Sequence, residues 1–463
     1  MKVTCYGAAG EVTGSCYWLK TTKSSVLIDC GIFQGSRETE QKNRLPRGLP
    51  VDGLSAVVLT HGHLDHTGRL PLLTQAGYRR PIFATPATID FTALILRDAA
   101  HVQAADVERD NRRLMRAGKP LEEPLYTPQD VENVLRLMQP VPYDTIQEVA
   151  PGVQIRIVDA GHMLGSGSVE VTATDGDQRR VILFSGDLGP RGAAILRDPV
   201  PFKQADVVFV ESTYGDHDHK TLDETLKELA AIVETAIARR GRMLVPVFAV
   251  GRTQQLLYHL SAMIRSGRLQ PFSIYLDSPM AIEATRLYAK HQDLFDEEAT
   301  ALAQSGQLRV DQPGLHFCPT ADDSKKLNNL PGPFMVMAGS GMCNAGRILH
   351  HLKNNLWRPD TDVLIVGYQG DGSLGRQLCD GKKEVRIFGE PVMVRGAIHT
   401  LGGFSAHAGQ TELFEWAQNL AAAKPKIYLT HGEERARQPL GKLITDRLKL
   451  PVGYPKFEES IQF

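Results

Sequence analysis

The stretch from Ala56 to Gly68, AVVLTHGHLDHTG, constrains the fold more than any other part of the chain. Its first four residues are apolar and include two valines, which predicts a short buried strand. A loop follows that holds His61, His63, Asp65 and His66 within six residues. Imidazole and carboxylate are the ligands that zinc takes, and iron and manganese also accept them. We therefore expect a metal site where this strand ends.

The spacing inside this stretch suggests how the ligands are shared. Residues two apart on an extended turn can point the same way, so His61 and His63 can hold one metal. Asp65 and His66 fall on the next bend and can hold a second. The alternative, a polar loop with scattered histidines, does not explain four ligand-type residues directly after a buried strand.

The same design recurs along the chain, as apolar runs that end in a His, Asp or Glu close to glycine. These residues are Asp29, Asp187, Glu211 and His431, and a glycine-rich loop adds His162. One such strand end carries little weight, because aspartate and glycine are common in turns. Several of them, with the histidine stretch among them, predict one site where neighbouring strand ends converge.

Seven of these residues suit a two-metal hydrolytic site. One zinc would be held by His61, His63 and His162, the other by Asp65, His66 and His431, and Asp187 would bridge both. Two close metals lower the pKa of water and neutralise charge on phosphoryl oxygens. Asp29 lies just outside this set and is expected to orient a ligand histidine through its ring N–H. Taken singly, His162, Asp187 and His431 could each be an ordinary loop residue.

Glu211 and His407 predict a second function beside the metals. A carboxylate next to a histidine favours the imidazolium form, which can protonate a leaving alkoxide as a general acid. A purely structural pair is the alternative. His399 competes for the same role, but its position near Leu401-Gly-Gly is more typical of sheet packing, so His407 is preferred.

Composition narrows the class of protein. The 463 residues are long enough for two or three domains, and 42% hydrophobic with 23% charged residues is typical of a globular chain. A net charge of −1 excludes a global attraction to nucleic acid, so metals would have to supply any local positive field. Six dispersed cysteines without a CxxC motif are expected to be reduced, buried thiols. With no signal peptide at Met1 and no membrane-length apolar run, we expect a cytoplasmic protein without membrane contact.

The order of elements predicts an insertion. Between Thr88 and about Met138 the apolar period is helical. From about Thr221 onward, strand–loop–helix units alternate, which predicts a doubly wound parallel sheet. The tail then returns to a strand ending in His431, so we expect it to complete the first domain. In the inserted domain, Arg252 and the loop with Ser340 and Gly341 are candidates for holding substrate phosphates through backbone N–H groups, although a tight turn with a surface arginine would look the same.

The His61-Gly-His63-Leu-Asp65-His66 stretch, with Asp29, His162 and Asp187, resembles the metallo-β-lactamase fold. Three more stretches, Glu211-Ser-Thr-Tyr-Gly, Phe404-Ser405-Ala-His407 and Thr430-His431-Gly-Glu, resemble the additional motifs of the β-CASP ribonucleases, a family that includes the cleavage and polyadenylation endonuclease and its bacterial and archaeal relatives. The resemblance implies an α/β fold, a metallo-β-lactamase αββα sandwich with an inserted α/β β-CASP domain. The expected boundaries are 1–210 and 396–463 for the metallo-β-lactamase domain and 211–395 for the insertion.

The resemblance also implies a function. It implies two zinc ions per chain, with manganese as the alternative, and hydrolysis of phosphodiester bonds in single-stranded RNA, by endonuclease and also 5′–3′ exonuclease action. Catalytic roles are expected for Asp29, Asp65, Glu211 and His407, and Ser405 is a further substrate-binding candidate. A histidine in the last motif, His431, is typical of RNA-directed members. Gly409 departs from the family, because many relatives carry Asp there.

Three alternatives remain at this stage. The first is a small-molecule ester or thioester hydrolase of the same fold, which would need neither a large inserted domain nor the Glu211–His407 acid. The second is a DNA nuclease, disfavoured only by His431. The third is a non-catalytic RNA-binding subunit, which would be expected to have lost some of the seven ligands. The sequence leaves a homodimer open.

Overall fold

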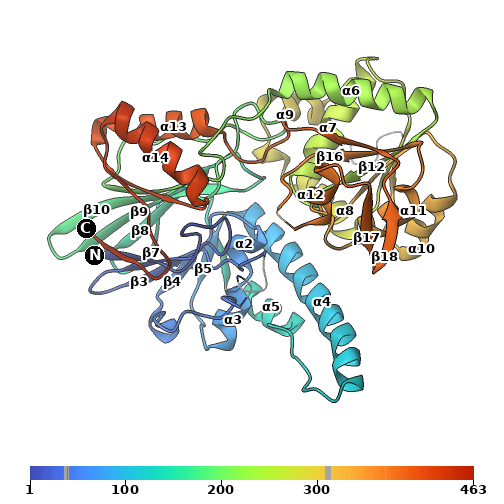
Figure 1. The fold of residues 1–463 in the computed structure, drawn as a ribbon. Helices are drawn as coiled ribbons and strands as arrows, with labels where there is room; N and C mark the ends of the chain where they lie inside the picture. The colour runs from blue at the N-terminus through green and yellow to red at the C-terminus, as the bar shows by residue number, and fades with distance from the viewer. Residues whose placement is uncertain (36–38, 40, 308–313, 371) are drawn as a thin grey trace. The chain divides into compact units, whose positions relative to one another are not determined.

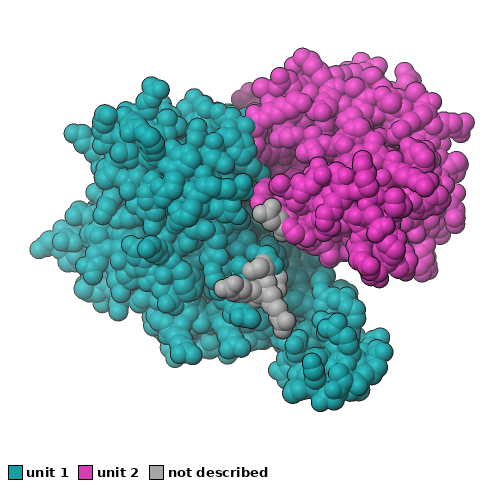
Figure 2. Space-filling view, in the orientation of Figure 1, with its two compact units in different colours: residues 1–191, 198–218, 407–463 teal, residues 192–197, 219–406 magenta. Residues whose placement is uncertain are grey.

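The computed structural model describes residues 1–35, 39, 41–307, 314–370 and 372–463 (Figure 1). They form two compact units, coloured separately in Figure 2. Unit 1 contains Met1–Arg191, Asp198–Asp218 and His407–Phe463, and unit 2 contains Gly192–Arg197 and His219–Ala406. The sequence predicts domain boundaries at 210/211 and 395/396. They lie within about a dozen residues of the points at 218/219 and 406/407 where the chain passes between the two units, and they stay a prediction.

Unit 1 is built on two seven-stranded sheets. The first has the order β22-β1-β2-β3-β4-β5-β6, and the second has the order β21-β20-β11-β10-β9-β8-β7. The first sheet comprises β1 (Lys2–Cys5), β2 (Tyr17–Lys20), β3 (Ser25–Ile28), β4 (Ala56–Val58), β5 (Ile82–Ala84), β6 (Met138–Pro140) and β22 (Ser460–Gln462). The second comprises β7 (Gln147–Ala150), β8 (Val153–Asp159), β9 (Gly167–Asp175), β10 (Gln178–Phe184), β11 (Val207–Glu211), β20 (Lys426–Thr430) and β21 (Val452–Gly453).

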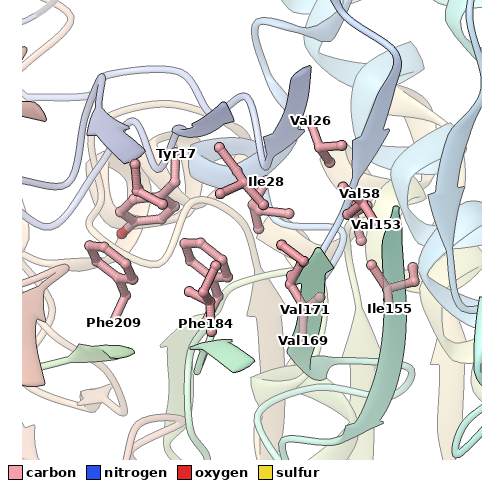
Figure 3. Close-up of a cluster of buried hydrophobic side chains, with 14 of the residues drawn as sticks. Tyr17, Val26, Ile28, Val58, Val153, Ile155, Val169, Val171, Phe184 and Phe209 are labelled. Atoms are coloured by element: carbon pink, nitrogen blue, oxygen red, sulfur yellow. The ribbon is translucent and has the colours of Figure 1, made fainter. Parts of the chain in front are cut away.

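The two sheets pack against each other through a continuous apolar core. Figure 3 shows side chains of the first sheet, such as Tyr17 and Ile28, facing side chains of the second, such as Phe184 and Phe209. The rings of Phe184 and Phe209 stack with centroids 5.0 Å apart, and Tyr17 lies 5.5 Å from Phe184. Successive strand residues point to opposite faces, so these residues form only the inner half of each strand.

Helices cover the outer faces of both sheets, which is why the strands are apolar on both sides. The helices are α2 (Leu64–Thr67), α3 (Leu70–Gln75), α4 (Pro86–Arg116), α5 (Pro128–Leu135), α13 (Gln410–Gln418) and α14 (Glu434–Leu448), with short 3₁₀ turns at Val51–Gly53 and Ala421–Ala423. On the first sheet, Leu27, Val57 and Leu59 pack with residues of α3, α4 and α5. On the second sheet, Val208 and Leu429 pack with residues of α13 and α14. The expected αββα sandwich is confirmed.

The helical period expected from Thr88 to Met138 is divided between α4 and α5. The first helix ends at Arg116, just before Gly118, which has a φ of +61°. Pro120 and Pro124 follow, and neither can continue a helix because proline lacks the backbone N–H. The second helix begins after Thr127, whose side chain and that of Asp130 form a capping box.

Unit 2 is the inserted α/β domain. Its six-stranded sheet has the order β14-β13-β15-β12-β16-β19, and every neighbouring pair is parallel. Its strands are β12 (Arg242–Pro246), β13 (Ser273–Leu276), β14 (Leu315–Phe317), β15 (Phe334–Ala338), β16 (Thr361–Ile365) and β19 (Ala397–Thr400), and a separate antiparallel hairpin consists of β17 (Glu384–Ile387) and β18 (Glu390–Met393). The doubly wound character is confirmed.

Apolar clusters lie on both faces of this sheet. Met243 and Met337 pack with α6, α7 and α8 on one face, while Leu244 and Val336 pack with α11 and α12 on the other. The helices are α6 (Leu222–Ala238), α7 (Arg252–Arg265), α8 (Pro279–Lys290), α9 (Glu297–Gln304), α10 (Ala321–Lys326), α11 (Arg347–Asn355) and α12 (Leu374–Cys379), with 3₁₀ turns at Gln292–Leu294 and Leu327–Asn329. Within the described ranges, no helix has the length and hydropathy needed to cross a bilayer.

Candidate metal centre

The histidine stretch leaves the first sheet at the end of β4 and turns directly into the short helix α2. His63 is the N-cap of this helix, and its carbonyl accepts the N–H groups of His66 and Thr67. Gly31 makes this turn possible, because a Cβ at Gly31 would lie 1.5 Å from the carbonyl oxygen of Asp65. The backbone of the ligand loop is thereby packed directly on the segment that follows β3.

His61, His63, His162 and Asp187 converge on one point. Nδ1 of His63 lies 3.1 Å from Nε2 of His61 and 3.1 Å from Nε2 of His162. Oδ2 of Asp187 lies 3.6 Å from Nε2 of His61 and 3.6 Å from Nε2 of His162, and both of these rings are buried. One ligand atom from each of the four lies within 4.8 Å of the others.

Asp65, His66, His431 and again Asp187 form a second group. Nε2 of His66 lies 3.3 Å from Nε2 of His431 and 3.3 Å from Oδ1 of Asp187. Oδ2 of Asp65 lies 3.4 Å from Nε2 of His431. The two groups share Asp187. Its Oδ2 faces His61 and His162, and its Oδ1 faces His66 and His431, while its role as a bridging ligand stays a prediction.

Asp29 lies behind the second group and contacts His66. Its Oδ2 lies 2.8 Å from Nδ1 of His66 and also accepts a hydrogen bond of 2.8 Å from the Thr60 hydroxyl. Its Oδ1 accepts the backbone N–H of Thr60 at 2.8 Å. The carboxylate therefore fixes the turn after β4 and the direction of the His66 ring together.

Glu211 and His407 are in contact, although 196 positions separate them in the chain. Nδ1 of His407 lies 3.0 Å from Oε1 of Glu211, and its Nε2 lies 4.0 Å from Oδ2 of Asp187. Glu211 is buried at the end of β11, and its carboxylate accepts backbone N–H groups from Leu188 and Thr213. The second nitrogen of the imidazole therefore faces the ligand groups. His399 has another partner, since its Nε2 lies 2.9 Å from Oδ1 of Asp362 on the sheet of unit 2.

The charges of this cluster are strongly coupled. Burial, followed by the proximity of His66, lowers the pKa of His61 well below its usual range, and burial also lowers that of His63. Both rings are therefore neutral at pH 7, the form in which imidazole binds a metal. Burial opposes ionisation of Asp187, but His431 and His66 hold its pKa well below the usual range.

Two further groups of this cluster are shifted toward their charged forms. Burial raises the pKa of Asp65, but the hydrogen bond from His431 and the proximity of His66 outweigh it, and the pKa is about 2. Burial likewise lowers the pKa of His407, but Glu211 outweighs it and raises that pKa to about 9.

Comparisons with known proteins agree with this geometry. Three family models match: the metallo-beta-lactamase superfamily over residues 9–238, the Beta-Casp domain over 253–378, and the Zn-dependent metallo-hydrolase RNA specificity domain over 391–455. The chain is 41% identical over 461 residues to ribonuclease TTHA0252 of Thermus thermophilus, and the match covers 100% of both chains. The chain belongs to the β-CASP family of the metallo-β-lactamase superfamily.

Other β-CASP relatives are more distant. The chain is 31% identical over 464 residues to the transcription termination factor FttA of Methanosarcina mazei, covering 97% of this chain and 70% of that protein. A crystal structure of a protein of unknown function from Enterococcus faecalis matches with a TM-score of 0.55 at 13% identity, covering 99% of each chain. That likeness shows the fold alone. The β-CASP assignment makes the chain a metal-dependent hydrolase, as the sequence predicts.

The residues of this β-CASP chain fit a divalent metal. Nδ1 of His63 lies 3.1 Å from Nε2 of His61 and 3.1 Å from Nε2 of His162. One proton on Nδ1 of His63 cannot form good hydrogen bonds to both of these nitrogens. Oδ1 of Asp187 is buried, and among the described residues it accepts no hydrogen bond of acceptable geometry. A cation would satisfy both features, because nitrogen and carboxylate oxygen are its ligands.

The four predicted substrate-binding residues all belong to unit 2. Arg252, Ser340 and Gly341 fall in the expected β-CASP insertion, whereas Ser405 falls in the expected C-terminal part of the metallo-β-lactamase domain. Arg252 is buried at the first position of α7. The hydroxyl of Ser340 accepts the N–H groups of Asn344 and Ala345, so it closes its own loop. Gly341 is buried below the ring of Phe248, and Ser405 is half-buried two residues before His407. Their roles stay predictions.

Three hydroxyl residues near the ligands are absent from the sequence-based prediction. Thr60 contacts Asp29 and lies 3.1 Å from Nδ1 of His61, and Thr213 lies 3.2 Å from Nδ1 of His431. Ser185 accepts the backbone N–H of Glu211 at 2.9 Å. A signal for one of them exists in the sequence, since Thr precedes His-Gly both at His61 and at His431. The hydroxyls of Thr60 and Thr213 would each orient one ring nitrogen of a ligand histidine when the other nitrogen binds a metal.

Proposed function

We propose that this chain is a zinc-dependent ribonuclease that hydrolyses phosphodiester bonds of single-stranded RNA in RNA processing or decay. The observation that carries the proposal is the pair of ligand groups that share Asp187, with His407 beside them. Metallo-β-lactamase folds of many specificities have similar ligands, whereas the Glu211–His407 pair adds a proton donor suited to an alkoxide leaving group.

The metal complement is the first part of the proposal. Two zinc ions per chain would be held by His61, His63 and His162 and by Asp65, His66 and His431, with Asp187 shared, and manganese is the alternative ion. When bound, such metals lower the pKa of water and neutralise charge on phosphoryl oxygens. Asp29 would keep the His66 ring in place through its Nδ1.

The remaining chemistry comes from the chain itself. Glu211 accepts two backbone N–H groups, which fixes its carboxylate, and its Oε1 holds Nδ1 of His407. Nε2 of His407 is thereby left to carry the proton that the leaving oxygen takes up. Asp65 contacts His431 and stays ionised, so its carboxylate is available to a metal, and we propose that it also orients the attacking water.

RNA is the proposed substrate because of the relatives and the last family model. The 41% identical relative is named a ribonuclease, and the model described as an RNA specificity domain covers 391–455, the part of the chain with His407 and His431. Backbone groups near Ser340 and Gly341, with Arg252 and Ser405, are proposed to hold RNA phosphates. Endonuclease action and 5′–3′ exonuclease action are both proposed.

The domain division and the cellular setting are also proposals. The metallo-β-lactamase domain would comprise 1–210 and 396–463, and the β-CASP insertion 211–395. All six cysteines are free thiols, five of them buried, which fits a reducing, cytoplasmic compartment. A homodimer remains a prediction.

The deciding experiment is cleavage of a 5′-labelled single-stranded RNA and of the DNA of the same sequence. Wild type, His63→Ala, His407→Asn and His399→Asn would be compared, with zinc and manganese measured in each sample. We expect wild type to cut RNA and spare DNA, and His63→Ala to lose activity together with metal. His407→Asn should keep its metal but cut about 10²–10⁴-fold more slowly.

His399→Asn is the matched control, because this histidine pairs with Asp362 in unit 2 and should be dispensable for cleavage. Cleavage of DNA as fast as RNA would favour a DNA nuclease. A protein that carries two metals but cuts neither strand, while hydrolysing a thioester or lactone, would favour a small-molecule hydrolase and overturn the proposal.

A further inference from the structure

Two aromatic side chains of unit 2 lie exposed at the carboxyl edge of its parallel sheet. Phe248 is 40% exposed, although phenylalanine is usually buried, and Tyr368 is 45% exposed. Phe248 follows β12 by two residues, and Tyr368 follows β16 by three. These strands are neighbours in the sheet, so both rings belong to the same edge.

The register of the sheet brings a third loop to the same place. β15 pairs with β12 on the side opposite to β16, and Ala338 at its end lies opposite Pro246. The glycine loop Gly339–Met342 therefore lies next to Phe248. The Gln369 side chain joins the two outer loops, because its Nε2 donates to the carbonyls of Gly341 at 2.8 Å and Gly367 at 3.2 Å.

The Phe248 ring rests on bare backbone. A Cβ built on Gly341 would lie 2.6 Å from two carbons of the ring, and one built on Gly367 would lie 3.2 Å from it. A side chain at Gly341 would displace the ring, and one at Gly367 would crowd it. Two glycines thus support one part of the ring, and 40% of the residue is exposed to solvent. Tyr368 comes directly after the second glycine, and its ring also lies 3.8 Å from a Cβ built on Gly370.

We infer that Phe248 and Tyr368 form a stacking surface for unpaired bases of single-stranded RNA. This inference rests on the proposed ribonuclease function. An aromatic ring that is held flat and open on one side binds the face of any base, which gives affinity without sequence preference. The chain has a net charge of −1, so general electrostatic attraction to RNA is weak and stacking must contribute more. In the adjacent loop at 339–342 the N–H of Ser340 already donates to the carbonyl of Ala345, so a phosphate between two stacked bases would contact the other backbone N–H groups of the loop.

The test compares RNA cleavage by wild type, Phe248→Leu, Tyr368→Leu and Phe388→Leu. Phe388 is the matched control, because it is a phenylalanine of the same unit, is 54% exposed, and contacts only His350 among the ring pairs of the described residues. Each protein would cut a set of single-stranded RNAs in which one nucleotide at a time lacks its base. kcat and KM would be measured separately, and circular dichroism would report folding.

We expect wild type to lose about tenfold in kcat/KM, mainly through KM, when the base at one or two particular positions is missing. Phe248→Leu should show about the same loss on intact RNA and little further loss on the RNA without that base. Phe248→Tyr should restore the wild-type pattern, since its ring stacks as well. Phe388→Leu should behave as wild type throughout.

Two results would overturn the inference while leaving the ribonuclease intact. One is a wild type that cuts every base-free RNA as well as intact RNA, which would assign the rings to another partner, such as a protein. The other is a folded Phe248→Leu and Tyr368→Leu pair with unchanged KM on intact RNA. A wild type that cuts no RNA at all would instead refute the proposed function, and the stacking surface with it.

Discussion

Oδ2 of Asp29 lies 2.8 Å from Nδ1 of His66, and this contact leaves Nε2 of the same ring facing His431. Asp29→Asn should therefore weaken metal binding without removing a ligand. Asn tolerates the backbone of residue 29, whose φ is +57°. Its single oxygen, however, cannot accept both the Thr60 backbone N–H, which meets Oδ1, and the His66 ring N–H, which meets Oδ2. We expect metal affinity to fall about 10–100-fold, measured by competition with a chromogenic chelator. Asp177→Asn, an exposed carboxylate in the β9–β10 turn, is the control, and equal affinities in both variants would contradict the role of Asp29.

The pKa of about 9 for His407 makes the stability of the metal-free protein depend on pH. Because the folded-state pKa lies above the ordinary value of 6.5, the folded protein binds the proton more tightly than the unfolded chain does. The stabilisation is complete below about pH 6.5 and is lost as the pH rises through about 9. In buffers with EDTA, wild type should lose more free energy of unfolding over this range than His407→Asn does. Parallel pH profiles from urea unfolding of the two proteins would refute this.

Gly409 begins α13 in a space that Asp218 already occupies. A Cβ at Gly409 would lie 2.8 Å from Oδ1 of Asp218, and that carboxylate accepts the N–H and the hydroxyl of Thr411. Gly409→Asp should therefore destabilise unit 1 by about 1–3 kcal/mol through contact and like-charge repulsion. Urea unfolding of the single variants and of Gly409→Asp with Asp218→Asn would show favourable coupling. Additive effects would mean that the two carboxylates do not meet.

Asp277 holds together one end of unit 2. It is completely buried after β13, and its carboxylate receives hydrogen bonds from Ser324 at 2.6 Å and from Arg347 at 2.7 Å, with His351 Nε2 at 2.6 Å. Asp277→Ala would leave the Arg347 charge without its partner and should cost about 3–5 kcal/mol of unfolding free energy.

The matched control for Asp277 is Asp380→Ala, which breaks the exposed Arg376–Asp380 pair and should cost less than about 1 kcal/mol. Thermal or urea unfolding distinguishes the two. Equal losses of unfolding free energy would show that the buried Asp277 contacts stabilise the protein no more than the exposed Arg376–Asp380 pair does.

Part of the candidate site could be predicted because several of its residues stand directly after an apolar strand. His61, Asp187, Glu211 and His431 all follow runs whose burial the sequence itself indicates, and strand ends in a two-sheet fold converge. Thr60 and Thr213 could not be assigned in this way. Their hydroxyl partners depend on how two separate strand ends meet in space, and a threonine beside a strand is otherwise ordinary.

The exposed rings of unit 2 show the opposite case. Phe248 lies within the apolar run at 244–250, in which the residue pattern alone predicts that every residue is buried. Its exposure depends on the glycines of two other loops, which sequence spacing does not bring together. Arg252 is similar, because an arginine after a glycine looks like a surface residue, yet it is buried at the start of α7.

The position of β20 between β11 and β21 has a consequence for synthesis on the ribosome. His431 arrives at the end of β20, about 370 residues after His61, and β22 then pairs with β1 at the edge of the first sheet. A growing polypeptide therefore carries the early histidines through the synthesis of about 370 further residues without the last member of the cluster. RNA near the ribosome thus meets a complete site only after β20 has been synthesised and has joined its sheet.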